Sequence, residues 1–359
     1  MFEIKSSKNI YHASDLDNIF ENKVKGGLPY VVRTTKNNGI RGFIVEDKQY
    51  ANDGNTLSFA QDTFSVFYQK QKYFTGNKVK VLKPKFECKN EGVMQYLTAS
   101  FQKSLTSLSW GVGSTIETIG LTIIQLPTKN GEIDFDFMES FIAELEAHRI
   151  AELEGYLLAT NLKDYNLTIE EQRVLEDFES GKIEWSEFKI DELFEINTYK
   201  KRFDANKVEI NEIGKPYVVR TALNNGVRGY IDEDEQFLNQ GNTISFGQDT
   251  ATMFYQEKPY FTGDKIKIVK SKVDKFNKQN AQFFITTMTN SFSSFGWGSS
   301  SFSVEIIKNQ NISLPIQNGQ PDYAIMETFI SAIQKLVIKD VVLYADRKID
   351  ATRSIVDLN

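Results

Sequence analysis

Short apolar runs separated by glycine turns fill the first part of the chain. β-Branched and aromatic side chains concentrate in five such runs, at residues 30–32, 42–45, 56–59, 64–68 and 78–82. Gly or Asn-Gly turns lie between most of them. Runs of this length and spacing are typical of strands in a β-barrel or sandwich. Residues 90–107 contain few turn signals, so helix and strand both remain open there.

A helical pattern follows. Between Asp134 and about Leu162 the chain has no proline and one glycine, and apolar residues recur mostly at three- and four-residue steps. The pattern begins again at about Asp322. Both apolar stripes are longer than a helix needs to cover the sheet of its own domain. We therefore expect two long helices that pair as an antiparallel coiled coil. The stripe positions include Met138, Phe141, Ile142 and Leu145 in the first helix, and Met326, Phe329, Ile330 and Ile333 in the second.

The two patterns occur twice because the chain contains a long internal repeat. Residues 29–82 align with residues 216–269 at a constant offset of 187, and 33 of the 54 paired positions are identical. Leu126-Pro127 aligns with Leu314-Pro315 at an offset of 188. A repeat this long is a duplicated domain and not a solenoid. The predicted fold class is therefore α+β, a tandem duplication of a β-rich domain followed by a long helix.

The repeat and the two helical patterns together divide the 359 residues into six predicted segments. They are a first β-rich domain at 1–130, a first long connector helix at 131–165, a linker at 166–184, a second β-rich domain at 185–320, a second long helix at 321–346 and a C-terminal tail at 347–359.

Charge is distributed unevenly over these segments. The chain carries a net charge of −6, but residues 1–130 carry +6 and residues 131–184 carry −11. The acidic balance therefore belongs to the connector, and the basic first domain is compatible with a nucleic acid partner. Residues 185–320 are neutral, so the case for a DNA surface is weaker there.

Composition excludes several other classes. One cysteine and two histidines exclude a structural zinc site and nearly exclude a multi-histidine one, so no metal is expected. The absence of a disulfide pair and of a signal peptide predicts a cytoplasmic location. No apolar run approaches the roughly eighteen residues that a membrane span requires.

Catalytic motifs are absent from the sequence. It has no nucleophile elbow, zinc-protease helix, P-loop or Asn-Pro-Pro-aromatic motif, so no catalytic residue is predicted. Asp62 and Asp249, in a repeated Gln-Asp-Thr, are candidate general bases, with turn capping as the alternative. Two other functions stay open: a duplicated enzyme with its active site between the units, and an adaptor that binds proteins through the acidic helix.

A repeated basic turn offers a stronger binding signal. Each copy places two arginines, a hydroxyl and two carboxamides around one turn: Arg33, Thr34, Asn37, Asn38 and Arg41 in the first, and Arg220, Thr221, Asn224, Asn225 and Arg228 in the second. Arginine suits phosphate or guanine, and asparagine suits adenine, so these residues are predicted to bind DNA. The alternative is a structural hairpin whose arginines pair with carboxylates.

The ordered set of motifs resembles the specificity subunits of type I restriction-modification systems. The resemblance rests on the repeated GNT-x-SF-x-QDT (Gly54 to Thr63, Gly241 to Thr250), the Phe-Tyr-Gln and Tyr-Phe-Thr-Gly blocks, and Leu-Pro before each helix, and it covers essentially the whole chain. The chain also resembles type IIB specificity chains. The resemblance implies two target recognition domains that each read half of a bipartite target in double-stranded DNA, and helices that space them.

The resemblance also implies partners. Two methyltransferase subunits would dock on the helices at the stripe positions named above and carry S-adenosylmethionine, restriction subunits would cleave, and this chain would hold no cofactor. Two half-sites need different base contacts. Residues 83–111 match residues 270–298 at only 8 of 29 positions, so base discrimination is predicted at Gln95, Gln102, Lys103, Gln282, Thr289 and Asn290. Relaxed packing in a variable segment is the alternative.

The two copies differ at their start. The second copy opens with residues 184–193 before Phe194-Glu195-Ile196, whereas the first copy goes from Met1 directly to Phe2-Glu3-Ile4. About ten residues of the second copy thus have no counterpart in the first. Either the first domain folds without a counterpart of these residues, or the start of the polypeptide lies upstream.

Overall fold

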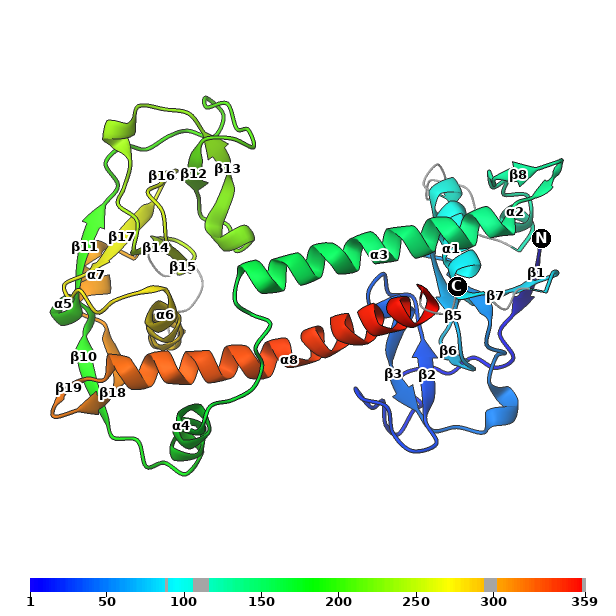
Figure 1. The fold of residues 1–359 in the computed structure, drawn as a ribbon, viewed down its shortest axis with the longest axis horizontal. Helices are drawn as coiled ribbons and strands as arrows, with labels where there is room; N and C mark the ends of the chain where they lie inside the picture. Colours follow the sequence, from blue (N-terminus) through cyan, green and yellow to red (C-terminus); the bar gives the residue numbers. More distant parts are fainter. Residues whose placement is uncertain (88–89, 106–115, 294–301, 357–359) are drawn as a thin grey trace. The chain divides into compact units, whose positions relative to one another are not determined.

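The chain forms two compact units, each containing one copy of the repeat (Figure 1). The computed structural model describes residues 1–87, 90–105, 116–293 and 302–356. The first unit comprises Met1–Leu153 and Lys348–Asn359, and the second comprises Glu154–Arg347.

Two sheets build the β-rich part of the first unit. An antiparallel sheet of four strands has the order β1 (Phe2–Ser6), β7 (Val79–Pro84), β4 (Thr56–Ala60) and β5 (Ser65–Gln69). In a second sheet, β2 (Leu28–Val31) lies between antiparallel β3 (Ile40–Ile44) and parallel β6 (Phe74–Thr75). Each of the five predicted apolar runs overlaps one of these strands.

A helix covers the larger sheet of this unit. Most of the segment that the sequence left open forms α1 (Glu91–Leu105), which packs against β5. The buried residues of this core come from the sheet and from α1, and they include Leu57, Phe59, Val66, Leu97 and Phe101. A short helix α2 (Ile116–Gly120) and the hairpin of β8 (Thr128–Lys129) and β9 (Glu132–Ile133) then lead into the long helix.

The second unit repeats this arrangement. Its larger sheet has the order β11 (Phe194–Thr198), β17 (Ile266–Ser271), β14 (Thr243–Gly247) and β15 (Met253–Gln256). Its smaller sheet has the order β13 (Val227–Ile231), β12 (Lys215–Val218) and β16 (Phe261–Thr262). Helix α6 (Lys278–Phe292) corresponds to α1 and packs against β15.

The second unit also has a third sheet. It consists of β10 (Trp185–Lys189), β18 (Asn311–Gln317) and β19 (Gln320–Pro321). Two short helices accompany it, α5 (Ile190–Leu193) and α7 (Val304–Lys308). The strand β10 contains the extra residues that the first copy lacks.

The repeated GNT-x-SF motif forms a buried polar network and not a binding surface. In the first unit, Thr56 Oγ1 lies 3.1 Å from Tyr73 Oη, and Gln69 Nε2 donates a hydrogen bond of 3.1 Å to Ser58 Oγ. All four side chains are buried. The same contacts recur in the second unit between Thr243 and Tyr260, and between Gln256 and Ser245. Buried polar groups need such partners, which explains why both copies contain these residue types.

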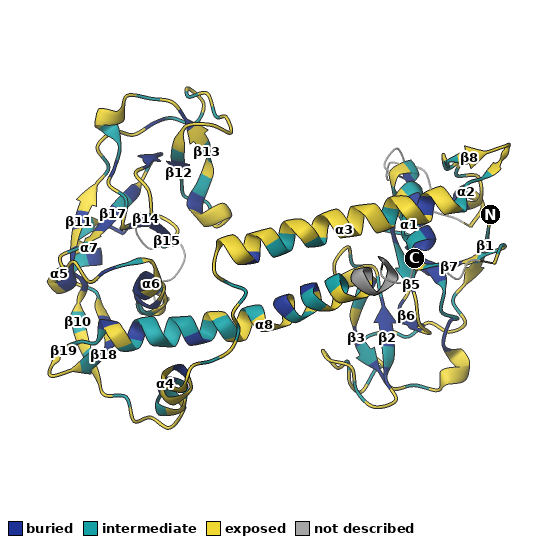
Figure 2. Ribbon diagram, viewed as in Figure 1, coloured by how far each residue is buried: buried dark blue, intermediate teal, exposed yellow. Residues whose placement is uncertain are grey.

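The two predicted long helices are α3 (Phe135–Ala159) and α8 (Tyr323–Val356). Most of α3 is exposed, whereas the first half of α8 is largely half-buried (Figure 2). The predicted tail at 347–359 is wrong as far as Val356, because α8 continues without a break through residues that contain no proline or glycine. Within the described ranges, no helix is long and apolar enough to span a membrane.

The predicted linker at 166–184 contains a helix of its own, α4 (Ile169–Glu179). Thr168 and Glu171 form a capping box at its N-terminus. The ring of Phe178 stacks on that of Phe329 in α8, with centroids 4.0 Å apart. The segment is therefore a folded part of the second unit, docked on α8, and not an extended connection.

Candidate nucleic-acid interface

The repeated basic turn has the same backbone in both units. It connects β2 to β3 through the short 3₁₀ helix η1 (Asn37–Gly39), and β12 to β13 through η3 (Asn224–Gly226). The φ angles of Asn37 and Asn38 are 47° and 53°, in the left-handed region that asparagine tolerates better than most residues. Gly39 has a φ of 77°, and a Cβ there would lie 3.1 Å from the ring of Phe67. The Asn-Asn-Gly sequence is thus required by the turn.

Hydrogen bonds within the protein occupy the carboxamides and hydroxyls of this turn. Asn37 Nδ2 donates to the carbonyl of Ile40 at 3.1 Å, and Asn38 Nδ2 donates to that of Tyr68 at 2.9 Å. Thr34 Oγ1 accepts a bond of 3.2 Å from the backbone N–H of Lys36. The matching bonds of the second unit involve Asn224, Asn225 and Thr221. For these six residues the geometry favours the structural alternative over base readout.

The first arginine of each turn belongs to an ion-paired cluster. Arg33 pairs with Asp62, whose carboxylate also accepts a hydrogen bond of 3.1 Å from Lys78 Nζ. In the second unit, Arg220 and Lys265 pair with Asp249. The hydrogen bond from Lys78 is the largest cause that holds the pKa of Asp62 below its usual range. A general base acting near neutral pH needs the opposite shift, so Asp62 is poorly suited to that role.

The second arginine of each turn has no such partner. Arg41 and Arg228 are exposed, and within the described part of the chain neither forms an ion pair or a hydrogen bond. Each lies close to a buried tyrosine of the same unit, Tyr30 or Tyr217. Burial raises the pKa of both tyrosines, and the arginine charge opposes that rise. These two guanidinium groups are the ones that the scaffold leaves available to phosphates or base edges.

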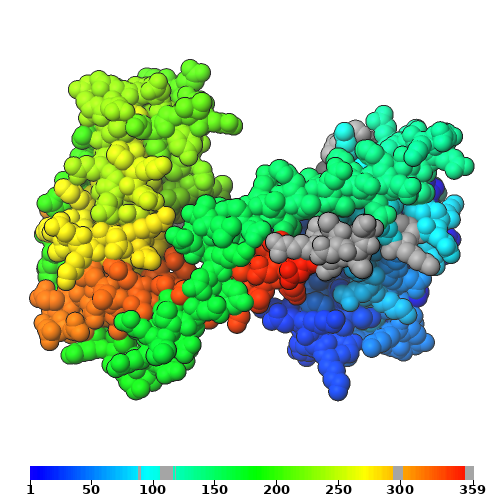
Figure 3. Space-filling model, viewed as in Figure 1, coloured from blue at the N-terminus to red at the C-terminus, as the bar shows by residue number. Residues whose placement is uncertain are grey.

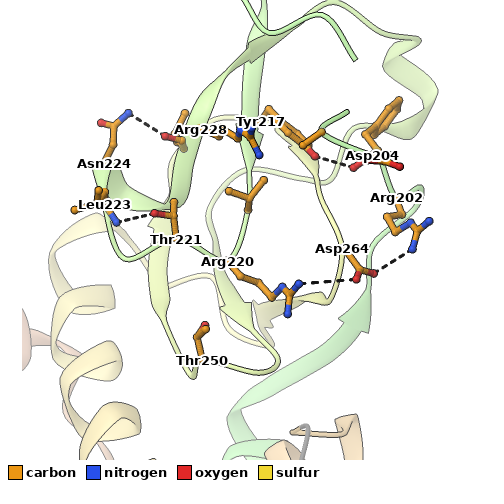
Figure 4. Close-up of a pocket in the computed structure, with 14 residues that line it drawn as sticks. Arg202, Asp204, Tyr217, Arg220, Thr221, Leu223, Asn224, Arg228, Thr250 and Asp264 are labelled. Carbon is orange, nitrogen blue, oxygen red and sulfur yellow. Dashed lines mark hydrogen bonds and ion pairs between the residues drawn. The ribbon is translucent and has the colours of Figure 1, made fainter. Parts of the chain in front are cut away.

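In the second unit the turn borders a cavity of about 850 Å³ (Figure 4). Arg202, Arg220 and Arg228 line it together with Asp264. Asp264 lies between two of them, with its carboxylate oxygens 3.5 Å from Arg202 Nη1 and 4.0 Å from Arg220 Nη2. Three arginines converge on a concave, partly polar surface, which is an arrangement suited to an anionic ligand such as a DNA backbone.

The same surface of the first unit carries different charges. The bridge between Ile10 and Thr75 in the first unit matches the bridge between Arg202 and Thr262 in the second, so Ile10 stands where the second unit has Arg202. Asn77 stands where it has Asp264, at the offset of 187. The arginines of the turn are retained in both units, but their surroundings differ. This pattern is expected of a shared scaffold that meets two different sequences. Arg202 and Asp264 were not predicted from the sequence, because they lie outside both the repeated basic turn and the diverged segments.

The six residues predicted to discriminate bases all lie on α1 and α6, but their side chains differ in hydrogen bonding and exposure. Gln102 Oε1 accepts the N–H of Val66 at 2.9 Å and its Nε2 donates to the carbonyl of Phe64 at 2.9 Å, so both ends of its amide are occupied. Thr289 Oγ1 donates to the carbonyl of Ile285. Gln95 is half-buried, and the side chains of Lys103, Gln282 and Asn290 are exposed. Residues 88–89, 106–111 and 294–298 of the diverged segments lie outside the described residues.

The predicted partner-binding positions divide into two groups. Met138 and Met326 are 0% exposed, so the prediction that they face a partner is wrong, since each anchors its helix in the core of its own unit. Phe329 and Ile330 also pack against the second core, and Ile142 and Ile333 are half-buried. Phe141 and Leu145 are 46% and 44% exposed on α3. The surface of α3 is visible in the space-filling view (Figure 3).

Comparison with known proteins identifies the family. Residues 1–155 and 182–343 match the model of the type I restriction modification DNA specificity domain. The type II restriction enzyme BgcI specificity subunit S.BcgI of Heyndrickxia coagulans is 24% identical over 320 residues, which cover 88% of each protein. The crystal structure of a type I restriction-modification system S subunit from M. genitalium superposes with a TM-score of 0.60 at 13% identity, over 99% of this chain and 92% of that one.

A duplicated β-rich domain, each copy with a basic turn and a following long helix, is the architecture of a two-domain DNA-specificity protein. The chain belongs to the family of the type I restriction modification DNA specificity domain and carries this domain twice. The predicted fold class is confirmed, and so is the function of a DNA sequence-specificity subunit. Nothing supports the alternative of an enzyme between the two units.

Proposed function

We propose that each unit reads one half of a bipartite target in double-stranded DNA through the surface around its basic turn. The observation that carries this proposal is the repeated guanidinium group of Arg41 and Arg228, which is exposed on the same turn of both units and has no ion-pair or hydrogen-bond partner among the described residues. The differing neighbours of the turn, such as Ile10 in the first unit and Arg202 in the second, supply different surroundings for two half-sites. The exposed side chains of α1 and α6 add further candidate contacts.

The experiment is a titration of labelled duplex DNA with the full chain at several salt concentrations. Phosphate contacts release counterions, so the logarithm of the association constant is expected to fall linearly with the logarithm of salt. A salt-insensitive interaction with a single protein partner, with no DNA binding, would instead support the adaptor. Copurification of the partner subunits followed by methylome sequencing then identifies the target.

We also propose that methylation and cleavage are performed by partner subunits. Two methyltransferase subunits would carry S-adenosylmethionine and dock on the helices, restriction subunits would cleave, and the complex would act in the cytoplasm. The apolar side chains exposed on α3 support docking there. The curated relative is a type II specificity subunit, so assembly into a type IIB complex stays an alternative to a type I complex. Methyl transfer to DNA by the purified single chain would contradict the proposal.

Pairing of the helices as an antiparallel coiled coil is part of the same proposal. Lys348 Nζ in α8 lies 3.1 Å from Glu146 Oε2 in α3. Lys163, just beyond α3, lies 3.8 Å from Asp346. The ion pair between Glu146 and Lys348 supports contact between the two helices. The test is disulfide formation between cysteines introduced at positions 146 and 348, in a chain in which Cys88 is replaced by serine.

A further inference from the structure

Two positions beside the basic turn carry different residues on a backbone that both units share. At the first position, the parallel bridge of Ile10 with Thr75 recurs in the second unit as that of Arg202 with Thr262. The next residue along the chain donates its backbone N–H to the same threonine carbonyl in both units, at 3.0 Å. Ile10 and Arg202 therefore occupy equivalent places.

The turn that follows this threonine supplies the second position. It reads Thr-Gly-Asn-Lys in the first unit and Thr-Gly-Asp-Lys in the second, so that Asn77 is equivalent to Asp264. The φ angles of the lysines, Lys78 and Lys265, are 57° and 58°. In each turn the glycine N–H donates a hydrogen bond of 2.8 Å to the last residue of β2 or β12. The two turns thus have the same conformation and differ in one side chain.

In the second unit the two side chains form an ion pair in the lining of the cavity (Figure 4). Arg202 Nη1 lies 3.5 Å from Asp264 Oδ1, and the side chains are 54% and 43% exposed. A contact this long leaves most donors of the guanidinium and most lone pairs of the carboxylate accessible to a ligand. The other acidic residue of the lining, Asp204, accepts the backbone N–H of Asn206 and caps its own turn.

The first unit offers an apolar group and a carboxamide at the same two places. Ile10 is 46% exposed. Asn77 is exposed, and its side chain forms no hydrogen bond with any residue that the structure describes. It differs in this respect from Asn37 and Asn38, whose carboxamides are occupied by backbone carbonyls. Both Ile10 and Asn77 are therefore available to a ligand.

The two combinations are complementary to two different base pairs. In the major groove, cytosine presents an amino donor and guanine presents the acceptors O6 and N7. A carboxylate accepts from the first and a guanidinium donates to the second, which is the chemistry of Asp264 beside Arg202. Adenine presents N6 and N7, which a carboxamide binds together, and thymine presents a methyl group, which an apolar side chain contacts. That is the chemistry of Asn77 beside Ile10.

We propose that these two positions form one reading pair in each unit, and that each reading pair discriminates a single base pair of its half-site in the major groove. The reading pairs are Ile10 with Asn77 and Arg202 with Asp264. The second unit then requires C·G at this base pair, and the first unit requires A·T. The proposal rests on the proposed function, because it needs the surface around the basic turn to face DNA.

The test exchanges the reading pairs between the units. Arg202→Ile with Asp264→Asn removes one charge of each sign, so the non-specific attraction to phosphates is expected to stay the same. Duplexes are selected from a randomised pool by the full chain, copurified with its partner subunits, and the bound duplexes are sequenced. One base pair of the second half-site is expected to change from C·G to A·T, with a preference of about tenfold or more.

The reciprocal exchange is the matched control. Ile10→Arg with Asn77→Asp is expected to change one base pair of the first half-site from A·T to C·G and to leave the second half-site as it is. A further variant, Arg202→Ala with Asp264→Ala, separates base reading from support of the fold. It is expected to remove the preference at one base pair, whereas loss of a structural contact would change the affinity for all duplexes alike.

Unchanged half-sites in both exchanges overturn the proposal, and so does a uniform change of affinity without a change of base preference. Arg228→Ala distinguishes this failure from a failure of the proposed function. If Arg228→Ala weakens DNA binding while the exchanges alter no base pair, the reading pairs are wrong and the basic turn still faces DNA. If none of these variants alters DNA binding, the proposed function is wrong as well.

Discussion

Glu171 Oε1 accepts a hydrogen bond of 2.6 Å from Ser331 Oγ, which joins α4 to α8. Its other oxygen accepts bonds from Lys335 Nζ at 2.9 Å and from the backbone N–H of Thr168 at 2.8 Å. Burial alone would raise the pKa of Glu171, but these three bonds together lower it to about 2. The carboxylate therefore stabilises the docked helix in its ionised form.

The first prediction is a loss of stability in acid. The pKa of Glu171 lies near 4.5 when the chain is unfolded and near 2 in the folded state. Its contribution is thus complete above about pH 4.5 and is lost as the pH falls toward 2, an effect on the order of 3 kcal/mol at most. Glu171→Gln is expected to be less stable than wild type at pH 7 and to approach it near pH 2, as measured by chemical denaturation. Glu170→Gln, at an exposed neighbour, should follow the wild-type curve.

The second prediction concerns the unpaired arginines. Arg41→Ala or Arg228→Ala is expected to cost about 1–3 kcal/mol of specific DNA binding if the guanidinium makes a bidentate base contact. A phosphate contact should instead lower the salt slope by about one. Arg173→Ala removes an exposed arginine from α4 and serves as the control. Unchanged binding of both variants at every salt concentration would make these arginines structural.

The third prediction separates an ion-paired aspartate from a catalytic one. Asp62→Asn removes the charge that Arg33 and Lys78 share, so both cations become available to phosphates. The affinity for non-specific duplex DNA is expected to rise and its salt dependence to steepen by about one charge. DNA titrations at two salt concentrations measure both quantities. Weaker DNA binding by a correctly folded variant would show that Asp62 itself is needed at the interface.

The fourth prediction places base discrimination in the diverged segment. Residues 270–298 transplanted in place of residues 83–111 are expected to change the half-site read by the first unit. Because Gln102 bonds to the backbone at Phe64 and Val66, one version of the chimera retains glutamine at that position. Sequencing of the methylated sites, made with the partner subunits present, provides the measurement. If the folded chimera modifies the original half-site, discrimination lies elsewhere.

The fifth prediction distinguishes surface from core on α3. Phe141→Ser and Leu145→Ser change side chains that are about half exposed, and they are expected to reduce copurification of the methyltransferase subunit with little effect on folding. Met138→Ala removes a fully buried side chain and is expected to destabilise the first unit by about 2–5 kcal/mol. Pull-down and thermal denaturation of the same three variants provide both measurements. Normal copurification of the two serine variants would move the docking surface away from this face.

The sequence was informative wherever a pattern repeats or has a period. The repeat predicted two similar domains, and the apolar runs predicted most of their strands. Prediction failed in segments whose apolar spacing is weak or is obscured by charged residues. The helix α4 lies in the most acidic part of the chain, so its buried Val174 and its stacked Phe178 did not stand out. Residues 347–356 continue α8 although their apolar spacing is weak.

The sequence predicted where the binding site lies, but not the role of each side chain in it. Arg33 and Asp62 are 29 residues apart, and only the folded sheet brings them together. The sequence therefore could not distinguish the paired Arg33 from Arg41, which has no ion-pair partner among the described residues. The carboxamides of Asn37 and Asn38 are polar in sequence, but backbone carbonyls occupy them in the turn. Roles of this kind depend on distances that no spacing rule contains.

The contact between α4 and α8 also has an evolutionary consequence. Glu171 and Ser331 both lie outside residues 185–320, so recombination with crossover points near residues 182 and 321 would replace the whole second recognition domain without breaking this bond. Among the rings that Phe178 meets, those of Trp185 and Phe283 lie inside the exchanged part, at 5.6 and 6.3 Å. An incoming domain with aromatic residues at these two positions would keep both ring contacts, and asparagines at positions 277 and 280 would keep the hydrogen bonds that Glu327 of α8 accepts. A gene of this design can then acquire a new half-site in one exchange.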